Sequence, residues 1–205
     1  MKVIALNGSP KPKGNTYLSL KTVCDQLATQ NIETEIIHVG NMDIKGCISC
    51  GQCKDGYCKF SDDSLREIVD KIYAADALIL GSPVYYSGIA GTFKCFLDRL
   101  FYPTKGRMRL KIGASVVVLR RSGGVATFDQ LNHYFLLSDM MVAPSNYWTV
   151  IHGALPGEIN QDEEGITVLN DLASNMAWML QIKEYSKEAY PIPSAPPRAR
   201  TNFIR

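Results

Sequence analysis

The stretch GSPVYYSGIAG, Gly81–Gly91, decides how this chain folds. It follows a short apolar run, Ala77–Leu80, and precedes Thr92–Phe101, where apolar residues recur at helical spacing. The order is therefore strand, loop, helix. Proline and glycine together fix the shape of the loop, because proline restricts the backbone and glycine permits tight turns. Two adjacent tyrosines give the loop flat faces with polar tips. The loop suits a planar aromatic ligand. A stiff connection between strand and helix, with its tyrosines buried in the core, would have the same sequence pattern.

The same alternation continues through the rest of the chain. We expect further strands at 2–7, 33–39, 113–119 and within 140–150, and further helices at 17–29, after residue 63, at 125–138 and around 169–180. Alternating strands and helices predict an α/β fold, a parallel sheet with helices on both faces. The 205 residues suffice for one domain with a sizeable core, expected at residues 1–185.

The end of the chain has a different composition. Residues 186–205 are rich in proline and lack a core pattern, which predicts an extended tail. Such a tail either hangs free or lies as an arm over a neighbouring subunit. The apolar residues Tyr190, Ile192, Phe203 and Ile204 would give such an arm something to bury.

Composition and charge limit the partners. Hydrophobic residues make up 46% and charged residues 20%, and the net charge of +2 is too small to favour nucleic acid or an anionic membrane. No apolar run approaches the length of a membrane span, and the apolar run at the N-terminus is too short for a signal peptide. We therefore expect a cytoplasmic protein that binds neither nucleic acid nor membrane.

A second informative loop, GSPKPKGNT at Gly8–Thr16, follows the first predicted strand and opens a helix. Backbone N–H groups at a helix N-terminus bind anions, and a phosphate is the expected one. The candidate ligands are Ser9, Lys11, Lys13, Gly14, Asn15 and Thr16. The glycine spacing fits neither a P-loop nor a dinucleotide fingerprint, which leaves a site for one phosphomonoester, or only a turn and a helix cap.

The loops after the first, third and fourth strands together predict one ligand. A third loop, Ser122, Gly123 and Gly124, follows the fourth strand, and its backbone can approach a ligand edge closely. In open parallel sheets such loops meet beyond the carboxyl ends of the strands. A ligand with a phosphate at one end and a planar, hydrogen-bonding ring at the other is FMN, whose redox chemistry the protein would position and tune.

These motifs, with the cysteines described next, resemble the NAD(P)H-dependent FMN reductase family of flavodoxin-like proteins, in the branch close to the iron–sulfur flavoproteins. The resemblance covers essentially the whole chain. It implies a flavodoxin-like, five-stranded parallel sheet of order 2-1-3-4-5, dimers or tetramers, and NADH or NADPH as co-substrate. It also implies that Ser9, Lys11, Asn15 and Thr16 hold the phosphate, with Pro83, Val84, Tyr85, Tyr86 and Gly88 on one side of the ring and Ser122, Gly123 and Gly124 on the other.

Four cysteines lie close together in residues 46–60. Cys47, Cys50, Cys53 and Cys58 have the spacing C-x2-C-x2-C-x4-C, which suits a 4Fe–4S cluster if Cys58 folds back to the same cube. Free or disulfide-prone thiols and a zinc site remain open alternatives. Because this loop leaves the second strand, we expect it on the rim that holds a flavin, in its own or an adjacent subunit.

Three functions fit these features, and none of them needs a catalytic side chain. The first is an FMN-dependent oxidoreductase that passes electrons from a reduced nicotinamide or ferredoxin-type donor to a quinone, flavin or other acceptor. The second is an electron carrier between redox protein partners, and a zinc-stabilised module without flavin is a third. Arg120 and Arg121 either meet a nicotinamide phosphate or are simply solvated.

Overall fold

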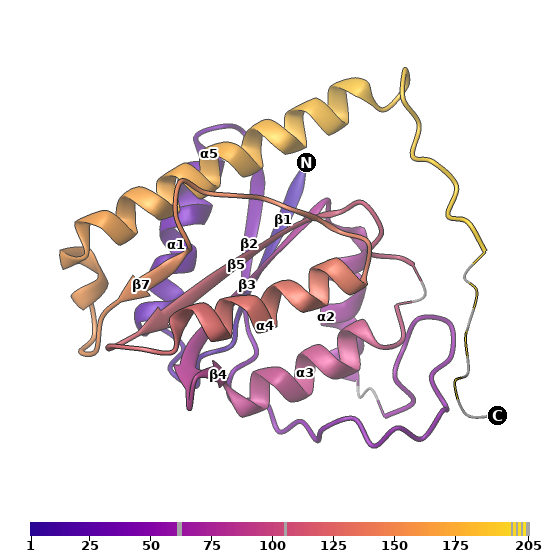
Figure 1. Cartoon of the computed structure of the whole chain (residues 1–205), viewed down its shortest axis with the longest axis horizontal. Helices are drawn as coiled ribbons and strands as arrows, with labels where there is room; N and C mark the ends of the chain where they lie inside the picture. The colour runs from indigo at the N-terminus through magenta and orange to yellow at the C-terminus, as the bar shows by residue number, and fades with distance from the viewer. Residues whose placement is uncertain (61–62, 105, 198, 200, 202, 204–205) are drawn as a thin grey trace.

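The computed structural model describes residues 1–60, 63–104, 106–197, 199, 201 and 203. Its strands are β1 (Lys2–Asn7), β2 (Glu33–His38), β3 (Ala77–Tyr85), β4 (Gly88–Ile89), β5 (Ile112–Leu119), β6 (Met141–Val142) and β7 (Val150–His152). Its helices are α1 (Asn15–Ala28), α2 (Asp63–Ala74), α3 (Gly91–Phe101), α4 (Gly124–Leu137), the short 3-10 helix η1 (Glu158–Gln161) and α5 (Glu163–Ser186). Figure 1 shows how they are arranged.

The sheet runs β2-β1-β3-β5-β6, and every neighbouring pair along this path is parallel. Counting only these five strands, the order is the predicted 2-1-3-4-5, and the predicted flavodoxin-like α/β fold is confirmed. One short strand was not predicted: β4 is antiparallel to β3. β7, which is parallel to β5, begins at the end of the predicted fifth strand.

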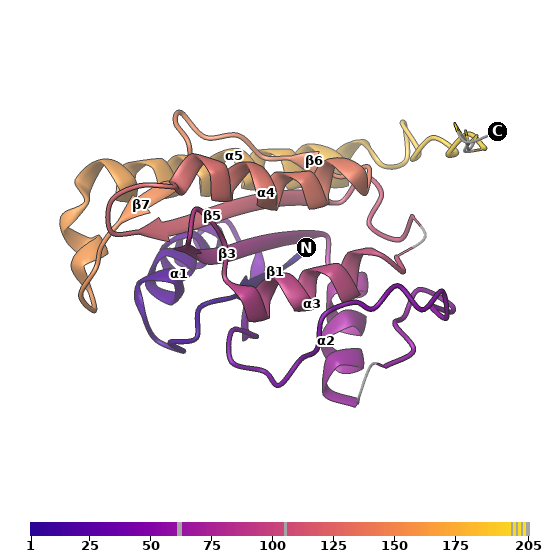
Figure 2. The same cartoon turned by 60° about the horizontal axis from the view of Figure 1, so that its bottom comes forward.

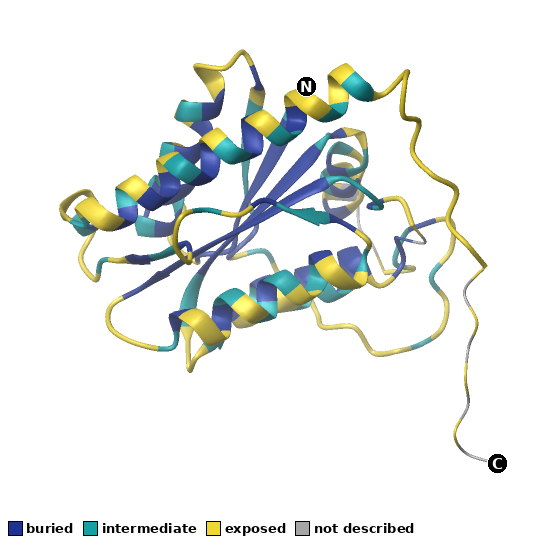
Figure 3. Ribbon diagram, turned by 45° about the horizontal axis from the view of Figure 1, so that its top comes forward, coloured by how far each residue is buried: buried dark blue, intermediate teal, exposed yellow. Residues whose placement is uncertain are grey.

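Helices cover both faces of this sheet and form two cores. One core joins the sheet to α1 and α5, and its fully buried residues include Leu20, Leu27, Leu169 and Met176. The other joins the sheet to α2, α3 and α4 and includes Ile72, Phe93, Phe96 and Phe135. The central strands are buried on both sides, while the helices expose their outer faces (Figure 3). This burial explains why β5 reads as one continuous apolar run.

The stretch Gly81–Gly91 differs from the prediction. We expected the strand to end at Leu80, but β3 stays paired with β5 as far as Pro83 and Val118, and its last two residues, Val84 and Tyr85, pair with β4. The other neighbour, β1, stops at the pair Asn7 and Gly81, so the missing N–H of Pro83 faces no partner strand. The chain then turns back at once into β4.

The predicted fifth strand, within residues 140–150, is divided. β6 pairs with the start of β5 at Ile112 and Gly113, and β7 pairs with its end from Val117 to Leu119. Residues 143–149 leave the sheet between the two short strands. The sequence does carry a signal of this excursion, because Pro144, Ser145 and Asn146 interrupt the apolar pattern between the two halves.

The end of the chain extends away from the body (Figures 1 and 2). α5 ends at Ser186, and residues 191–197 are exposed and have no regular structure. Arg109 Nη1 donates a hydrogen bond to Pro193 O. Residues 198, 200, 202, 204 and 205 of the predicted tail lie outside the described residues. Among the helices described, none combines the length and apolarity needed to cross a bilayer.

Candidate functional site

The three predicted loops meet at the carboxyl end of the sheet. β1, β3 and β5 lie side by side there, with Asn7 beside Gly81 and Gly81 beside Val116. Gly8 N donates to Gly81 O at 2.8 Å, which ties the first loop to the second. We call residues 8–16, 82–90 and 120–124 together the rim.

The first loop is held from inside by Asn7, the last residue of β1. Its buried side chain donates from Nδ2 to Pro12 O at 3.1 Å and accepts at Oδ1 from Ser9 N at 3.1 Å. Ser9 Oγ in turn accepts from Lys11 N at 3.2 Å. Sequence reasoning missed Asn7, although a polar residue ending a buried strand is a signal that could have found it.

The end of β2 supports the same loop from the side. His38 Nε2 lies 2.8 Å from Ser9 O, within hydrogen-bonding distance. A β-carbon at Gly40 would lie 2.0 Å from the same carbonyl oxygen, so only glycine fits there. The first loop is therefore fixed in shape before any ligand arrives.

The first turn of α1 leaves its N–H groups available to a ligand. Its N-cap is Gly14, no side chain caps it, and its first turn carries no acidic residue. Unpaired N–H groups at a helix N-terminus attract an anion. Ser9 and Thr16 are buried beside them, while Lys11 and Lys13 are exposed. This is the arrangement that a phosphate needs.

The side chain of Asn15 has partners that the sequence did not predict. Its Nδ2 donates to Leu155 O at 2.8 Å, and its Oδ1 accepts from Gly157 N at 2.8 Å. The segment after β7 is thereby fastened to the start of α1. In this structure the amide is committed to that segment, and the backbone N–H of residue 15 is what faces a phosphate-sized ligand.

The second loop is a two-residue hairpin between β3 and β4. Tyr86 and Ser87 at its tip have φ values of 50° and 58°, both in the left-handed region that such a turn requires. Gln130 of α4 holds the tip, donating from Nε2 to Ser87 O at 3.3 Å and accepting from Ile89 N at 3.4 Å. Tyr86 is fully exposed and Tyr85 is about half exposed, so both rings are open to a ligand.

The third loop lies directly against the hairpin. Gly123 has φ of 87°, and a β-carbon there would lie 2.7 Å from Ser87 Oγ. Gly124, the first residue of α4, packs against Val150, and Ser122, Arg120 and Arg121 are exposed. The second and third loops therefore form one continuous surface.

The rim fits FMN in its donor chemistry and its shape. One end offers uncapped N–H groups, hydroxyls and lysines, which suit a phosphate. The other end offers exposed aromatic rings opposite a glycine turn with φ in the left-handed region, where backbone can approach a flat ring. The structure brings all fourteen predicted flavin-site residues to this rim, and of their side chains only the Asn15 amide is committed to another segment.

The cysteine loop, residues 46–60, runs along α3 away from the rim (Figures 1 and 2). Its tip is a hairpin in which Lys54 and Tyr57 exchange backbone hydrogen bonds of 3.1 and 2.9 Å. Asp55 and Gly56 at that tip have φ of 52° and 86°, so they form a two-residue turn. Cys53 and Cys58 directly flank this hairpin, which brings the fourth cysteine back toward the third.

The hairpin tip packs against α2. Tyr73 donates its hydroxyl hydrogen to Gly56 O, and Tyr73 O accepts from Lys111 Nζ at 2.8 Å, just before β5 begins. The tip therefore lies toward the amino end of the sheet. The tip is therefore away from the rim of its own subunit, and a position beside the rim of an adjacent subunit stays a prediction.

The four thiols do not gather around one point. Within the described residues, no group of three histidine, cysteine, aspartate or glutamate side chains is arranged to hold a metal ion. No disulfide joins the six cysteines either. Cys24 lies in the core between α1 and the sheet, where burial raises its pKa to about 11.

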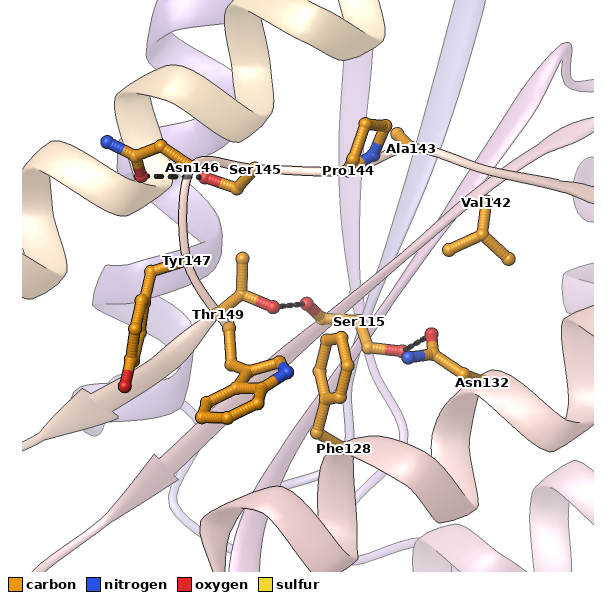
Figure 4. A pocket seen from close by; sticks show the side chains of 11 residues that line it. Ser115, Phe128, Asn132, Val142, Ala143, Pro144, Ser145, Asn146, Tyr147 and Thr149 are labelled. Carbon is orange, nitrogen blue, oxygen red and sulfur yellow. Dashed lines mark hydrogen bonds between the residues drawn. The ribbon is translucent and has the colours of Figure 1, made fainter.

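A cavity of about 470 Å³ lies apart from the rim. It occupies the excursion between β6 and β7 and is walled by α4 (Figure 4). Ser115 and Asn132, which line it, are hydrogen-bonded to each other at 2.8 Å, and the exposed residues Tyr147 and Trp148 also line it. None of the predicted flavin-site residues lines this cavity.

Comparison with known proteins identifies the family of this chain. The model of a family described as NADPH-dependent FMN reductase matches residues 1–154. An iron-sulfur flavoprotein of Methanocaldococcus jannaschii is 35% identical over 191 residues, covering 89% of this chain and 98% of the relative. One from Archaeoglobus fulgidus is 31% identical over 169 residues, covering 80% of this chain and 83% of the relative.

Solved structures support the fold. The flavoenzyme NAD(P)H:acceptor oxidoreductase FerB of Paracoccus denitrificans superimposes with a TM-score of 0.65 at 17% identity, over 88% of this chain and 97% of that one. RosB with a bound formylated riboflavin phosphate intermediate gives 0.70 at 14% identity, over 100% and 94%. With the family match over most of its length, the chain belongs to the NADPH-dependent FMN reductase family of oxidoreductases.

Proposed function

We propose that this chain binds one FMN on its rim, takes hydride from NADH or NADPH, and passes electrons to a quinone, a free flavin or another acceptor. The observation that carries the proposal is the closure of three separate loops into one surface. Gly8 N bonds to Gly81 O at 2.8 Å, and Gly123 lies against Ser87. Separate hollows would not hold a ligand with a phosphate at one end and a ring at the other.

The phosphate would lie at the start of α1. The N–H groups of Asn15 and Thr16 belong to an uncapped helix terminus, whereas Gly14 N already donates to Lys11 O at 3.2 Å. The hydroxyls of Ser9 and Thr16 are the candidate side-chain donors. The exposed Lys11 and Lys13 add positive charge, which a phosphate dianion favours. Because Asn7, His38 and Gly40 fix this loop, little ordering remains to oppose binding.

The ring would lie between the hairpin and the glycine turn. Pro83, Val84, Tyr85, Tyr86 and Gly88 would contact one side, and Ser122, Gly123 and Gly124 the other. The FMN supplies the hydride and electron chemistry when bound. The protein orients the ring, keeps one side accessible to a nicotinamide, and offers Arg120 and Arg121 near the glycine turn to a nicotinamide phosphate.

The cysteine loop is the second part of the proposal. Cys47, Cys50, Cys53 and Cys58 would hold a 4Fe–4S cluster, which when bound supplies one-electron transfer. Three observations support the cluster: the spacing of the four cysteines, the hairpin that returns Cys58 toward Cys53, and the similarity to relatives that are named iron-sulfur flavoproteins. The separation of the thiols means that the loop must tighten when the cluster is bound.

Electron transfer between FMN and cluster would then connect subunits. The hairpin tip lies toward the amino end of the sheet, away from its own rim. A homodimer or homotetramer could bring it to the rim of a neighbour, and the exposed tail could serve as an arm in that assembly. We also keep the prediction of a cytoplasmic protein, on the grounds of its clustered cysteines.

Anaerobic mixing with NADPH and NADH tests the reductase. The purified full chain, loaded with FMN, should lose its flavin absorbance near 450 nm on mixing, about the usual wavelength for a protein-held flavin, and regain it when a quinone is added. A folded sample that takes up no FMN would refute the site. A flavin that stays oxidised would refute the use of nicotinamide but not the binding.

A specific observation also favours a carrier function. The cysteine loop is exposed, with a hairpin at its tip, as docking to a redox protein would require. A carrier should exchange electrons with reduced ferredoxin while ignoring both nicotinamides. Iron, sulfide and zinc assays on anaerobically purified protein decide between a cluster, a zinc site and thiols without metal.

A further inference from the structure

The cavity between β6 and β7 lies against backbone groups of β5. β6 pairs with β5 as far as Gly113, and β7 pairs with it again only from Val117. On this edge of β5, Gly113 O accepts from Ala143 N and Val117 N donates to Thr149 O, both at 2.9 Å. Successive residues of a strand turn their backbone groups to alternate neighbours. Ser115, which stands between these two residues, therefore turns its N–H and C=O into the gap.

Two hydrogen-bond donors meet in this gap. Ser115 is only 2% exposed; its carbonyl accepts from Thr149 Oγ1, and its hydroxyl donates to Asn132 Oδ1 at 2.8 Å (Figure 4). The remaining donors are Ser115 N–H and Asn132 Nδ2, and within the described part of the chain neither meets an acceptor. Buried N–H groups are normally hydrogen-bonded. Two adjacent donors therefore favour an occupant that supplies an oxygen acceptor.

The other walls of the cavity are apolar and aromatic. Phe128 of α4 lines it, and so do Tyr147 and Trp148, whose rings meet edge to face with centroids 4.9 Å apart. None of the described residues that line the cavity has a charged side chain. A charged molecule would lose its hydration there without gaining a partner. A volume of about 470 Å³ also lies within the range of about 300–1,000 Å³ that is usual for small-molecule sites.

The surface beside the cavity disfavours anions. A neighbouring hollow of about 370 Å³ shares Asn146 and Tyr147 with the cavity and is also lined by Glu163 and Glu164. These carboxylates give the approach a negative potential. Phosphorylated molecules such as FMN and NADPH are therefore poor candidates for this cavity.

The wall that the excursion forms is held in place by α5. Ser145 Oγ donates to Val168 O at 2.7 Å, and Asn146 N donates to Asp171 Oδ2 at 2.7 Å. These bonds fix the excursion at its middle, while Thr149 fixes its end to β5. Because the wall is already ordered, little conformational entropy remains to oppose ligand binding.

We propose that this cavity is a second ligand site, which takes one neutral, planar aromatic molecule that carries a carbonyl oxygen. The carbonyl oxygen accepts from Ser115 N–H and Asn132 Nδ2, and the ring packs against Phe128 and Trp148. Aromatic ketones, aromatic amides and quinones belong to this chemical class. The site does not depend on the proposed FMN site, because none of the residues assigned to FMN lines the cavity.

The test is a titration of the isotopically labelled full chain with acetophenone, followed by nuclear magnetic resonance, with and without FMN. The chain has two tryptophans, so two indole N–H signals are expected, and a Trp178→Phe variant assigns them. Trp148 lines the cavity, whereas Trp178 on α5 is exposed and lies outside it. Benzoate is the matched ligand, because it has the shape of acetophenone and a negative charge.

Acetophenone should shift the Trp148 signal until one molecule is bound per chain, leave the Trp178 signal in place, and bind equally with and without FMN. Benzoate should bind roughly tenfold more weakly or not at all. Asn132→Leu removes one donor and should weaken acetophenone binding roughly fivefold. Asn170→Leu, at an exposed position of α5 outside the cavity, should bind acetophenone as wild type does.

Several results would overturn the site. Acetophenone at its solubility limit that leaves the Trp148 signal unmoved shows that the cavity takes no such ligand, and competition by FMN shows that the probe lies on the rim. A Trp148 signal that follows the chain concentration instead of acetophenone shows an interface between copies. Equal affinity in Asn132→Leu refutes the assigned donors; should that variant fail to fold, equal binding of benzoate and acetophenone by wild type refutes the neutral site. A chain that binds no FMN leaves this titration intact.

Discussion

Gly123 lies so close to Ser87 that a β-carbon at residue 123 would stand 2.7 Å from Ser87 Oγ and 2.9 Å from Ser87 Cα. The two residues are far apart in the sequence, one in the glycine turn after β5 and the other at the tip of the β3–β4 hairpin. Their contact makes the two walls of the proposed ring site a single surface. The position of each wall therefore depends on the other.

Replacing Gly123 by alanine should weaken both the fold and the binding of FMN. The left-handed φ of 87° costs an alanine about 1–2 kcal/mol, and the added methyl must also push the hairpin away. Gly106→Ala is the control, since Gly106 has φ of 84° with open space around it. Urea unfolding and FMN fluorescence titration measure both effects. Equal FMN affinity in the two variants would contradict the proposed ring site.

Replacing Tyr86 by asparagine should affect the ligand alone. Tyr86 is fully exposed with φ of 50°, and asparagine tolerates that backbone better than most residues. Loss of a stacked aromatic ring is worth about 1.5 kcal/mol at most, or roughly a tenfold weaker FMN affinity. The melting temperature without FMN should not change.

The matched control for Tyr86 is Tyr185→Asn on α5, another tyrosine that is almost fully exposed. That variant should keep the wild-type FMN affinity. A Tyr86→Asn variant that also binds FMN as wild type does would show that the hairpin tip is outside the ring site.

Replacing Asn15 by alanine should lower the stability of the apoprotein and its FMN affinity together. The change leaves Leu155 O and Gly157 N without their partner, at a cost of about 1–3 kcal/mol if water does not replace it. It also frees the segment after β7 beside the proposed phosphate seat. Chemical unfolding and isothermal titration with FMN measure the two quantities.

Asn175→Ala provides the comparison for Asn15, because Asn175 Nδ2 donates to Pro144 O at 3.1 Å far from the rim. It should reduce stability without changing FMN affinity. If both variants lose affinity equally, the effect of Asn15 is general destabilisation and not a property of the site.

Stability should fall in mild alkali because of Cys24. Burial raises the pKa of this thiol from 9.0 to about 11, so between these values the folded chain binds more protons than the unfolded chain. The stabilisation is fully present below pH 9 and is lost as the pH rises toward 11. Between pH 9 and pH 10 the free energy of unfolding should drop by about 1 kcal/mol from this group.

Denaturant unfolding of wild type and Cys24→Ala at pH 8, 9 and 10 isolates the contribution of the Cys24 thiol to the pH dependence of stability. The variant is less stable at every pH, so the quantity to compare is the change in the free energy of unfolding with pH. Between pH 9 and pH 10 this free energy should fall by about 1 kcal/mol less in Cys24→Ala than in wild type. The pKa values of Tyr73 and Tyr134, raised by burial from 10.0 to about 12, also lower the stability as the pH approaches 10, but both proteins contain these tyrosines, so their effect cancels in the difference between the two slopes. Parallel slopes for the two proteins would contradict the assignment.

Local sequence patterns determined much of this protein. The apolar runs and the helical spacing fixed the alternation of elements, and the alternation fixed a parallel sheet with helices on both faces. The loop at Gly8–Thr16 could be recognised as a helix start suited to an anion, because a helix N-terminus needs only its own backbone to bind one. The cysteine spacing could likewise be read directly, since it lies within one loop.

Only the tertiary structure decided those features that depend on contacts between residues distant in the sequence. β3 extends to Tyr85 because β5 pairs with it as far as Pro83 and β4 pairs with its last two residues, and the fifth strand divides because each half pairs with a different part of β5. The amide of Asn15 is held by Leu155 and Gly157, and the amide of Asn132 accepts from Ser115. Such contacts join residues distant in the sequence, and no local pattern records which partner a side chain will meet.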